Sequence, residues 1–90
     1  MSQAVVDPNE LRRFAATLKR FKADLEMSAA GVHGSLLALG DTWRDQEHDR
    51  FRQDFEQEMQ SFEKFYERAD EFIQYLLRKA ERIEEYLSQR

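Results

Sequence analysis

The side chains that come closest to forming a chemical site are two histidines and a run of carboxylates near the middle of the chain. His33 and His48, with neighbouring aspartates, could in principle ligate a zinc ion, and paired carboxylates could act as general acid and base. The acidic residues between positions 45 and 58 alternate with arginines, however. That mixture is typical of a solvated helix surface with charge pairs between successive turns, so we predict neither a metal site nor a catalytic site.

Other signatures of chemistry are missing from the sequence. It contains no glycine-rich phosphate loop, nucleophile elbow or HExxH segment. It has no cysteine, so a disulfide or a thiolate metal site is excluded. We therefore expect a protein that is not an enzyme, takes no cofactor and acts through its surfaces.

Composition points to long helices. Three glycines and one proline in 90 residues leave few breakers, and 36% of the residues are charged. The net charge of −4 and the lack of a basic patch argue against nucleic-acid binding. No apolar stretch approaches the roughly 20 residues that span a bilayer, and the mixed, net acidic surface of the second half argues against stable membrane binding.

The first expected helix covers residues 8–39. Asp7 can cap its first turn, Pro8 suits the first helical position, and Glu10 has the spacing to complete a capping box. Gly40 follows the last apolar residue and suits a left-handed C-cap. One seven-residue column of this helix consists of Leu11, Leu18, Leu25, Val32 and Leu39, and a second consists of Phe14, Phe21, Ser28 and Ser35.

The later part of this helix has a thin surface. Ala29, Ala30, Gly31 and Gly34 accompany the change from phenylalanine to serine in the second column. A second helix could approach closely there, or the two glycines could mark a local bend. The sequence leaves these two alternatives open.

A short turn over residues 40–42 then leads to a second helix over residues 43–87. Thr42 and Asp45 have capping-box spacing, with Trp43 at the first position. So short a connection makes the two helices antiparallel neighbours. We therefore predict one all-α domain over residues 1–90, an antiparallel two-helix hairpin.

The second helix has an apolar stripe wider than one partner helix covers. Its three columns are Phe55, Phe62, Ala69, Leu76 and Ile83; Phe51, Glu58, Phe65, Phe72, Lys79 and Tyr86; and Met59, Tyr66, Ile73, Ala80 and Leu87. We expect dimerisation into a four-helix bundle, the alternative being a wider seam within one chain. Glu58 and Lys79 interrupt an apolar column, where they could pair across the dimer or extend into solvent.

The central segment Trp43–Phe55 resembles the WXG100, or ESAT-6-like, family. Proteins of that family are about this long, with a central Trp-x-Gly turn between two helices and an aromatic residue eight positions after the tryptophan. Phe51 holds that aromatic position here, and Phe55 follows four residues later. Asp45 replaces the family's glycine, but it can start a helix instead. We assign Trp43, Asp45, Phe51 and Phe55 to the turn motif.

The resemblance implies a small substrate or component of a type VII secretion system, exported folded as a homodimer or heterodimer without a cleaved signal peptide. The N-terminal segment indeed lacks the pattern of a secretory signal peptide. We thus expect a cytoplasmic protein that is then secreted. Tyr66 and Asp70 match the family's Tyr-x-x-x-Asp/Glu export signal, although they lie well inside the second helix.

The expected partners are a second copy or a paralogous hairpin, and beyond these a secretion ATPase or a larger effector. The predicted interface consists of Leu18, Phe21, Leu25, Ala29, Val32, Phe62, Phe65 and Phe72. The alternative function is a cytoplasmic adaptor or chaperone for a larger helical toxin, docked on the wide stripe of the second helix.

Overall fold

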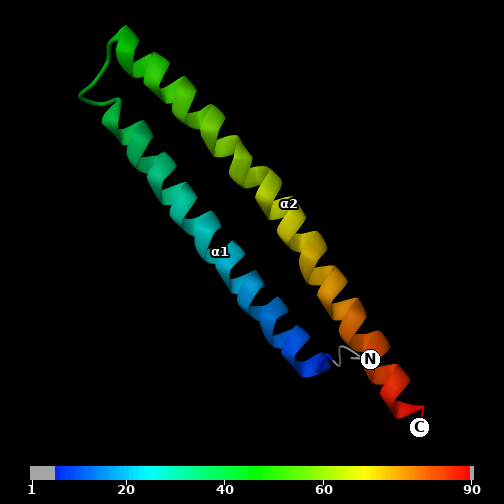
Figure 1. Cartoon of the computed structure of the whole chain (residues 1–90). Coiled ribbons are helices and arrows are strands. Elements are labelled where there is room, and N and C mark those ends of the chain that lie inside the picture. The colour runs from blue at the N-terminus through cyan, green and yellow to red at the C-terminus, as the bar shows by residue number, and fades with distance from the viewer. Residues whose placement is uncertain (1–5, 90) are drawn as a thin grey trace.

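Two helices account for nearly all of the structure. The computed structural model describes residues 6–89, within which the chain forms α1 (Pro8–Leu39) and α2 (Gln46–Ser88) and no strand. The helices lie antiparallel, side by side along a rod of 69 × 21 × 18 Å, and α2 reaches beyond both ends of α1 (Figure 1). The predicted all-α hairpin is confirmed. The four-helix bundle stays a prediction, because it needs a second chain.

Local chemistry at residues 7–10 explains where α1 begins. Asp7 Oδ1 accepts a hydrogen bond of 2.9 Å from the backbone N–H of Asn9, and Pro8 occupies the first helical position. The carboxylate of Glu10 pairs with Arg13 Nη2 at 2.8 Å instead of turning back toward Asp7. The cap was therefore predicted correctly, but the reciprocal half of the capping box was not.

Gly40 ends α1 without the left-handed backbone that the sequence predicts. Its φ of −63° and ψ of −15° are right-handed. The chain keeps turning in the helical sense, since the N–H of Asp41 bonds to Ala38 O at 3.0 Å and that of Trp43 to Leu39 O at 3.0 Å. The absence of a side chain at Gly40 instead lets the His48 ring lie close to the backbone. An added Cβ would lie 3.2 Å from Leu37 O and 3.3 Å from His48 Cε1.

The predicted start of the second helix at Trp43 is wrong, because α2 begins at Gln46. Asp45 is its N-cap and accepts a hydrogen bond of 3.0 Å from the N–H of His48. The Thr42 hydroxyl instead faces back toward Leu39 O at 3.4 Å. The N–H groups of Thr42 and Trp43 both bond to Leu39 O, so these residues continue the turn that ends α1. The connection covers residues 40–45.

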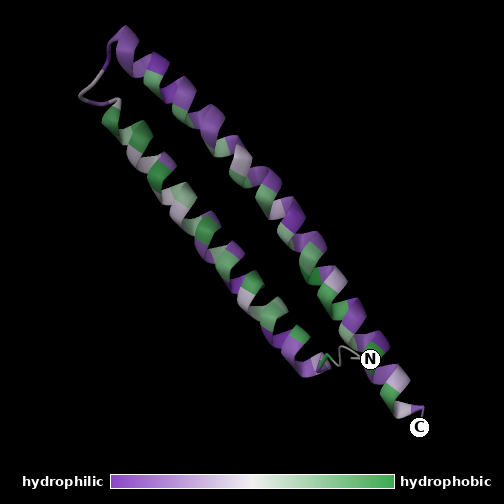
Figure 2. Cartoon of the chain, viewed as in Figure 1, coloured by the Kyte–Doolittle hydropathy of each residue, from purple (hydrophilic) through white to green (hydrophobic). Residues whose placement is uncertain are grey.

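The hairpin core is a thin seam rather than a deep interior. Its buried apolar residues are Ala15, Leu36, Tyr66, Ala69, Ile73 and Ala80. Small residues such as Ala15 and Ala69 let the helix axes approach, but two helices alone cover little surface. In Figure 2 hydrophobic residues dominate the C-terminal part of α1, whereas the first turns of α2 are mostly hydrophilic. Within residues 6–89 neither helix has an apolar segment that could cross a membrane.

Candidate functional site

The predicted turn motif forms one aromatic cluster. The Trp43 ring lies 5.0 Å from the His48 ring, edge to face, and 6.0 Å from the Phe51 ring. Phe51 in turn lies 5.9 Å from Phe55, one helical turn further along α2. Trp43 is half-buried. It therefore closes the turn end of the hairpin with a large apolar surface.

Asp45 does not adopt a backbone conformation that requires glycine. Its backbone is extended, with φ of −105° and ψ of −178°, a region open to any residue. The carboxylate instead caps α2, and a negative charge there is favourable at a helix N-terminus. Aspartate at this position is thus compatible with the hairpin.

His48 is the one polar residue buried in the described part of the chain, with 6% of its surface exposed. Its ring lies between Trp43 and Gly40. Its Nε2 atom has no hydrogen-bond partner. The signal was present in the sequence, since His48 lies seven residues before Phe55 and continues that apolar column.

One long face of the hairpin carries all the ion pairs between the helices in residues 6–89, and we call it the polar face. The Arg12 guanidinium binds both carboxylate oxygens of Glu84 at 2.7 Å. Lys22 Nζ lies 3.1 Å from Asp70, and His33 Nε2 lies 2.8 Å from Glu56. These pairs are spread along the seam, so together they fix the alignment of α1 against α2.

The ion pairs also change the titration of their members. The hydrogen bonds from Arg12 hold the pKa of Glu84 below its ordinary value, and the hydrogen bond to Asp70 raises the pKa of Lys22. Both effects favour the charged forms. Because the side chains are partly exposed, the pairs contribute alignment more than stability.

Tyr66 lies in the seam beside the polar face, with 8% of its surface exposed and no hydrogen-bond partner for its hydroxyl. Burial, followed by the charges of Glu26 and Glu63, raises its pKa. Asp70 is exposed and engaged with Lys22. The structure thus brings Tyr66 and Asp70 to one side of α2, and their role as an export signal stays a prediction.

The opposite long face holds most of the predicted interface, and we call it the apolar face. Phe21 of α1 meets Phe65 of α2 edge to face with ring centroids 5.9 Å apart. Phe21 is 53% exposed and Phe72 41%, even though the Arg68 guanidinium covers part of the Phe72 ring at 4.8 Å. Val32 is exposed as well, whereas Leu18, Leu25, Ala29, Phe62 and Phe65 are half-buried.

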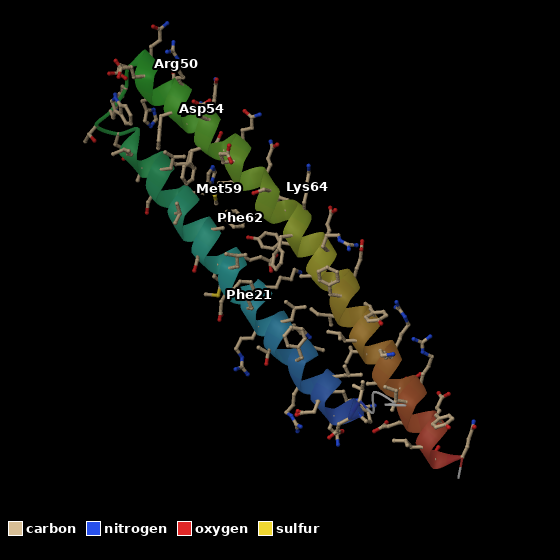
Figure 3. All side chains as sticks on the ribbon, viewed as in Figure 1. Phe21, Arg50, Asp54, Met59, Phe62 and Lys64 are labelled. Carbon is tan, nitrogen blue, oxygen red and sulfur yellow. The ribbon has the colours of Figure 1, made fainter. Side chains whose placement is uncertain are left out.

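A groove of about 480 Å³ runs along the apolar face toward the turn. Its walls include Leu25, Val32, Phe55 and Phe62, and Ser28 leaves it open on the α1 side. Figure 3 shows Phe21, Met59 and Phe62 in the region between the helices, while Arg50, Asp54 and Lys64 point outward from α2. Phe14 is not among the predicted interface residues, although it is 56% exposed and shares a seven-residue column with Phe21.

Glu58 and Lys79 are charged residues in the apolar column that also holds Phe65 and Phe72. Glu58 lines the groove and is exposed, and Lys79 is half-buried. Within residues 6–89 neither side chain takes part in an ion pair. The apolar face therefore presents one unmatched acid and one unmatched base.

Comparison with known proteins agrees with this geometry. The family model described as "WXG100: Proteins of 100 residues with WXG" matches residues 3–86, nearly the whole chain. Searches of curated proteins and of solved structures found no similar chain. The matched range includes α1, nearly all of α2 and the turn cluster around Trp43. The chain therefore belongs to the WXG100 family, whose members are small, helical, non-enzymatic proteins associated with type VII secretion.

Proposed function

We propose that this protein is an exported component of a type VII-like secretion system, and that it acts as a self-associated hairpin through protein–protein contacts. Family membership gives the association with type VII secretion. The observation that carries the rest is the apolar face, on which Phe14, Phe21 and Phe72 are each at least two-fifths exposed. Contiguous exposed apolar surface of this kind marks an interaction site.

A second copy of the chain is the partner that this face fits best. Two protomers in face-to-face contact would bury the phenylalanines in the centre of a four-helix bundle. The polar faces, which already carry ion pairs within each chain, would remain in water. A paralogous hairpin with a similar face is the alternative occupant, and a secretion ATPase or larger effector would bind the assembled bundle.

The route follows from the proposed role. The protein folds and pairs in the cytoplasm, and the secretion system exports the folded bundle without removing a signal peptide. The turn cluster around Trp43 keeps the hairpin closed during this passage, since its rings join the connection to the first turns of α2.

An immunoblot of medium and cells from the native host tests this proposal. The comparison uses a strain in which the ATPase of the secretion system is deleted, with a strictly cytosolic protein as the lysis control. We expect the protein in the medium of the intact strain and only in the cells of the deletion strain. Retention in the cells of the intact strain, with the system active, would contradict export, and the adaptor function would then lead.

Conservative substitutions test whether Tyr66 and Asp70 act as the export signal. Tyr66→Phe removes only the unpartnered hydroxyl, so we expect the free energy of unfolding to stay the same or rise slightly. Loss of this variant from the medium would show that the hydroxyl is read during export. Asp70→Asn, which keeps the size of the side chain, is the matched variant for the acidic position.

A further inference from the structure

A pocket of about 440 Å³ lies on the polar face, beside the ion pair of His33 with Glu56. Both helices line it. Its floor is half-buried and also lines the groove of the apolar face, and it consists of Ala29, Met59 and Phe62. These three residues therefore form the wall between the two hollows, and the base of the pocket is apolar.

Two acidic side chains form the rim of this pocket. Glu26 comes from α1 and Glu63 from α2, and both are exposed. Within residues 6–89 Glu63 takes part in no ion pair. Glu26 has only a contact of 3.9 Å with Lys22 Nζ, which lies closer to Asp70 at 3.1 Å. The rim thus carries two carboxylates, one from each helix, whose charges are largely unmatched.

The other charges at the pocket do not neutralise these two carboxylates. His33 and Arg52 are both engaged with Glu56, at 2.8 Å and 3.5 Å. The described lining includes no lysine or arginine. A second hollow on the polar face, by contrast, is lined by three basic side chains, those of Arg12, Lys19 and Lys22. The two hollows therefore differ in charge, and the one nearer the turn attracts a cation.

The Tyr66 hydroxyl is an additional polar group at this pocket. Tyr66 lines the pocket with 8% of its surface exposed, and its hydroxyl has no hydrogen-bond partner. The charges of Glu26 and Glu63 both act on the hydroxyl, so it lies toward the rim where these carboxylates are. Both carboxylates end long, exposed side chains that rotate freely and can admit a donor. A buried oxygen without a partner is costly, and a donor from a ligand would remove that cost.

We propose that this pocket binds an arginine side chain on the surface of a partner protein. The guanidinium bridges Glu26 and Glu63 and donates a hydrogen bond to the Tyr66 hydroxyl oxygen. Its methylene groups cover Met59 and Phe62 at the floor. Arginine suits the pocket better than lysine, because its planar fork presents several donors to acceptors that come from different directions.

The open form of the pocket favours a protein over a free cation as the source of the guanidinium. Because the rim is exposed, a small cation keeps much of its hydration there, whereas a protein adds further contacts along the polar face. The polar face also stays uncovered when the apolar face is occupied. The site is therefore present in a single chain and does not depend on the self-association in the proposed function.

Titration of the isotope-labelled full chain with capped arginine (N-acetyl-arginine methylamide) tests this chemistry, followed by two-dimensional NMR of the backbone amides. Capped citrulline, which replaces the charged guanidinium with a neutral urea of similar shape, is the control ligand. We expect capped arginine to shift signals of residues 26–33 and 56–66, with a dissociation constant on the order of a millimolar, and capped citrulline to leave them in place. Equal responses to the two ligands, or no shift at the pocket with capped arginine, would overturn the proposal.

Matched double variants locate the binding. Glu26→Gln with Glu63→Gln removes both rim charges and should raise the dissociation constant of capped arginine at least about tenfold. Asp24→Asn with Glu67→Gln removes the same net charge from one exposed position on each helix outside the pocket, and should change the constant less than about twofold. Equal weakening by the two double variants would mean that the ligand responds to the net charge of the chain. Tyr66→Phe should weaken binding about threefold, and wild-type affinity would remove the hydroxyl from the site.

A five-residue peptide with arginine between alanines distinguishes a partner's side chain from a free small molecule. It should bind at least as tightly as capped arginine, because its backbone adds contacts at the rim. Binding of capped arginine without binding of the peptide would mean that the pocket admits only a small guanidinium compound, which overturns the partner protein as the source. Light scattering on the same samples keeps the two proposals apart, since binding by a chain that is monomeric would support this site while contradicting self-association.

Discussion

The two long faces of the hairpin differ in whether their side chains find partners within a single chain. On the polar face the charged side chains that bridge the helices find partners within the molecule, such as Arg12 with Glu84 and Lys22 with Asp70. On the apolar face Phe21 and Phe72 stay exposed and Glu58 has no ion-pair partner within residues 6–89. Ion pairs therefore align the two helices of the hairpin, whereas the phenylalanines of the apolar face stay exposed in a single chain.

A glutamate introduced on each face in turn should give the largest difference in the dissociation constant of the dimer. Phe21→Glu puts a charge on the apolar face of each protomer and removes the contact of Phe21 with Phe65. We therefore expect the dissociation constant of the proposed dimer to rise at least about hundredfold. Ala23→Glu, at an exposed position on the polar face beside Lys22, should leave the dissociation constant nearly unchanged. Sedimentation equilibrium measures both constants, and circular dichroism checks that the helices are retained. Equal effects of the two substitutions would contradict the distinction between the faces.

The turn cluster closes the end of the apolar face. Removal of its largest ring, that of Trp43, should have the second largest effect, a loss of folding stability. Trp43→Ala takes away the contacts with His48 and Phe51. Because Trp43 is half-buried, we expect the free energy of unfolding to fall by about 2 kcal/mol. Urea denaturation at a fixed protein concentration measures the change. Trp43→Phe should retain most of the stability, and an unchanged midpoint for Trp43→Ala would show that the cluster does not hold the turn.

Alanine substitutions at two glycines compare the crowded turn at Gly40 with the open surface of α1 at Gly34. A Cβ at Gly40 meets Leu37 O and the buried His48 ring, whereas a Cβ at Gly34 meets nothing within 4 Å. We expect Gly34→Ala to stabilise the hairpin by up to about 1 kcal/mol and Gly40→Ala to destabilise it by about 1 kcal/mol. Thermal unfolding measures both. Stabilisation by both substitutions would mean that the His48 ring does not limit the space at Gly40.

The smallest expected effect lies on the polar face and depends on pH. Arg12 lowers the pKa of Glu84 below its ordinary 4.5 in the folded chain. The stabilisation from this pair is therefore present above that value and is lost as the pH falls through the folded pKa. Unfolding curves from neutral pH to about pH 3 should show the wild type losing a small advantage over Glu84→Gln. A constant difference across that range would mean that the pair does not contribute.

Local signals in the sequence predicted the fold well where one residue had one role. Asp7 and Pro8 marked the start of α1. One heptad column of α2 marked its buried side, with Tyr66, Ile73 and Ala80, but the predicted columns of α1 missed its buried residues Ala15 and Leu36. The start of α2 was missed because Thr42 and Asp45 both make good N-caps, and only the hydrogen bonds from Thr42 and Trp43 to Leu39 decide between them. The residue types alone do not tell which of these two candidate N-caps is used.

Contacts across the hairpin were less predictable than the elements. The pairing of His33 with Glu56 depends on the alignment of α1 with α2 rather than on spacing within either helix. The burial of His48 likewise depends on the path of the connection, which brings Gly40 against its ring. The interface stays a prediction. Phe21, Phe65 and Phe72 were assigned to it because they lie in heptad columns that mark a helix face without knowledge of its partner.

The molar mass of the wild-type chain in solution tests the central claim most directly, that the apolar face is completed by a second copy. Light scattering at micromolar concentration should give twice the 10.8 kDa of one chain, and Phe21→Glu should return the value to that of one chain. A wild-type mass of 10.8 kDa at the same concentration would contradict self-association through the apolar face.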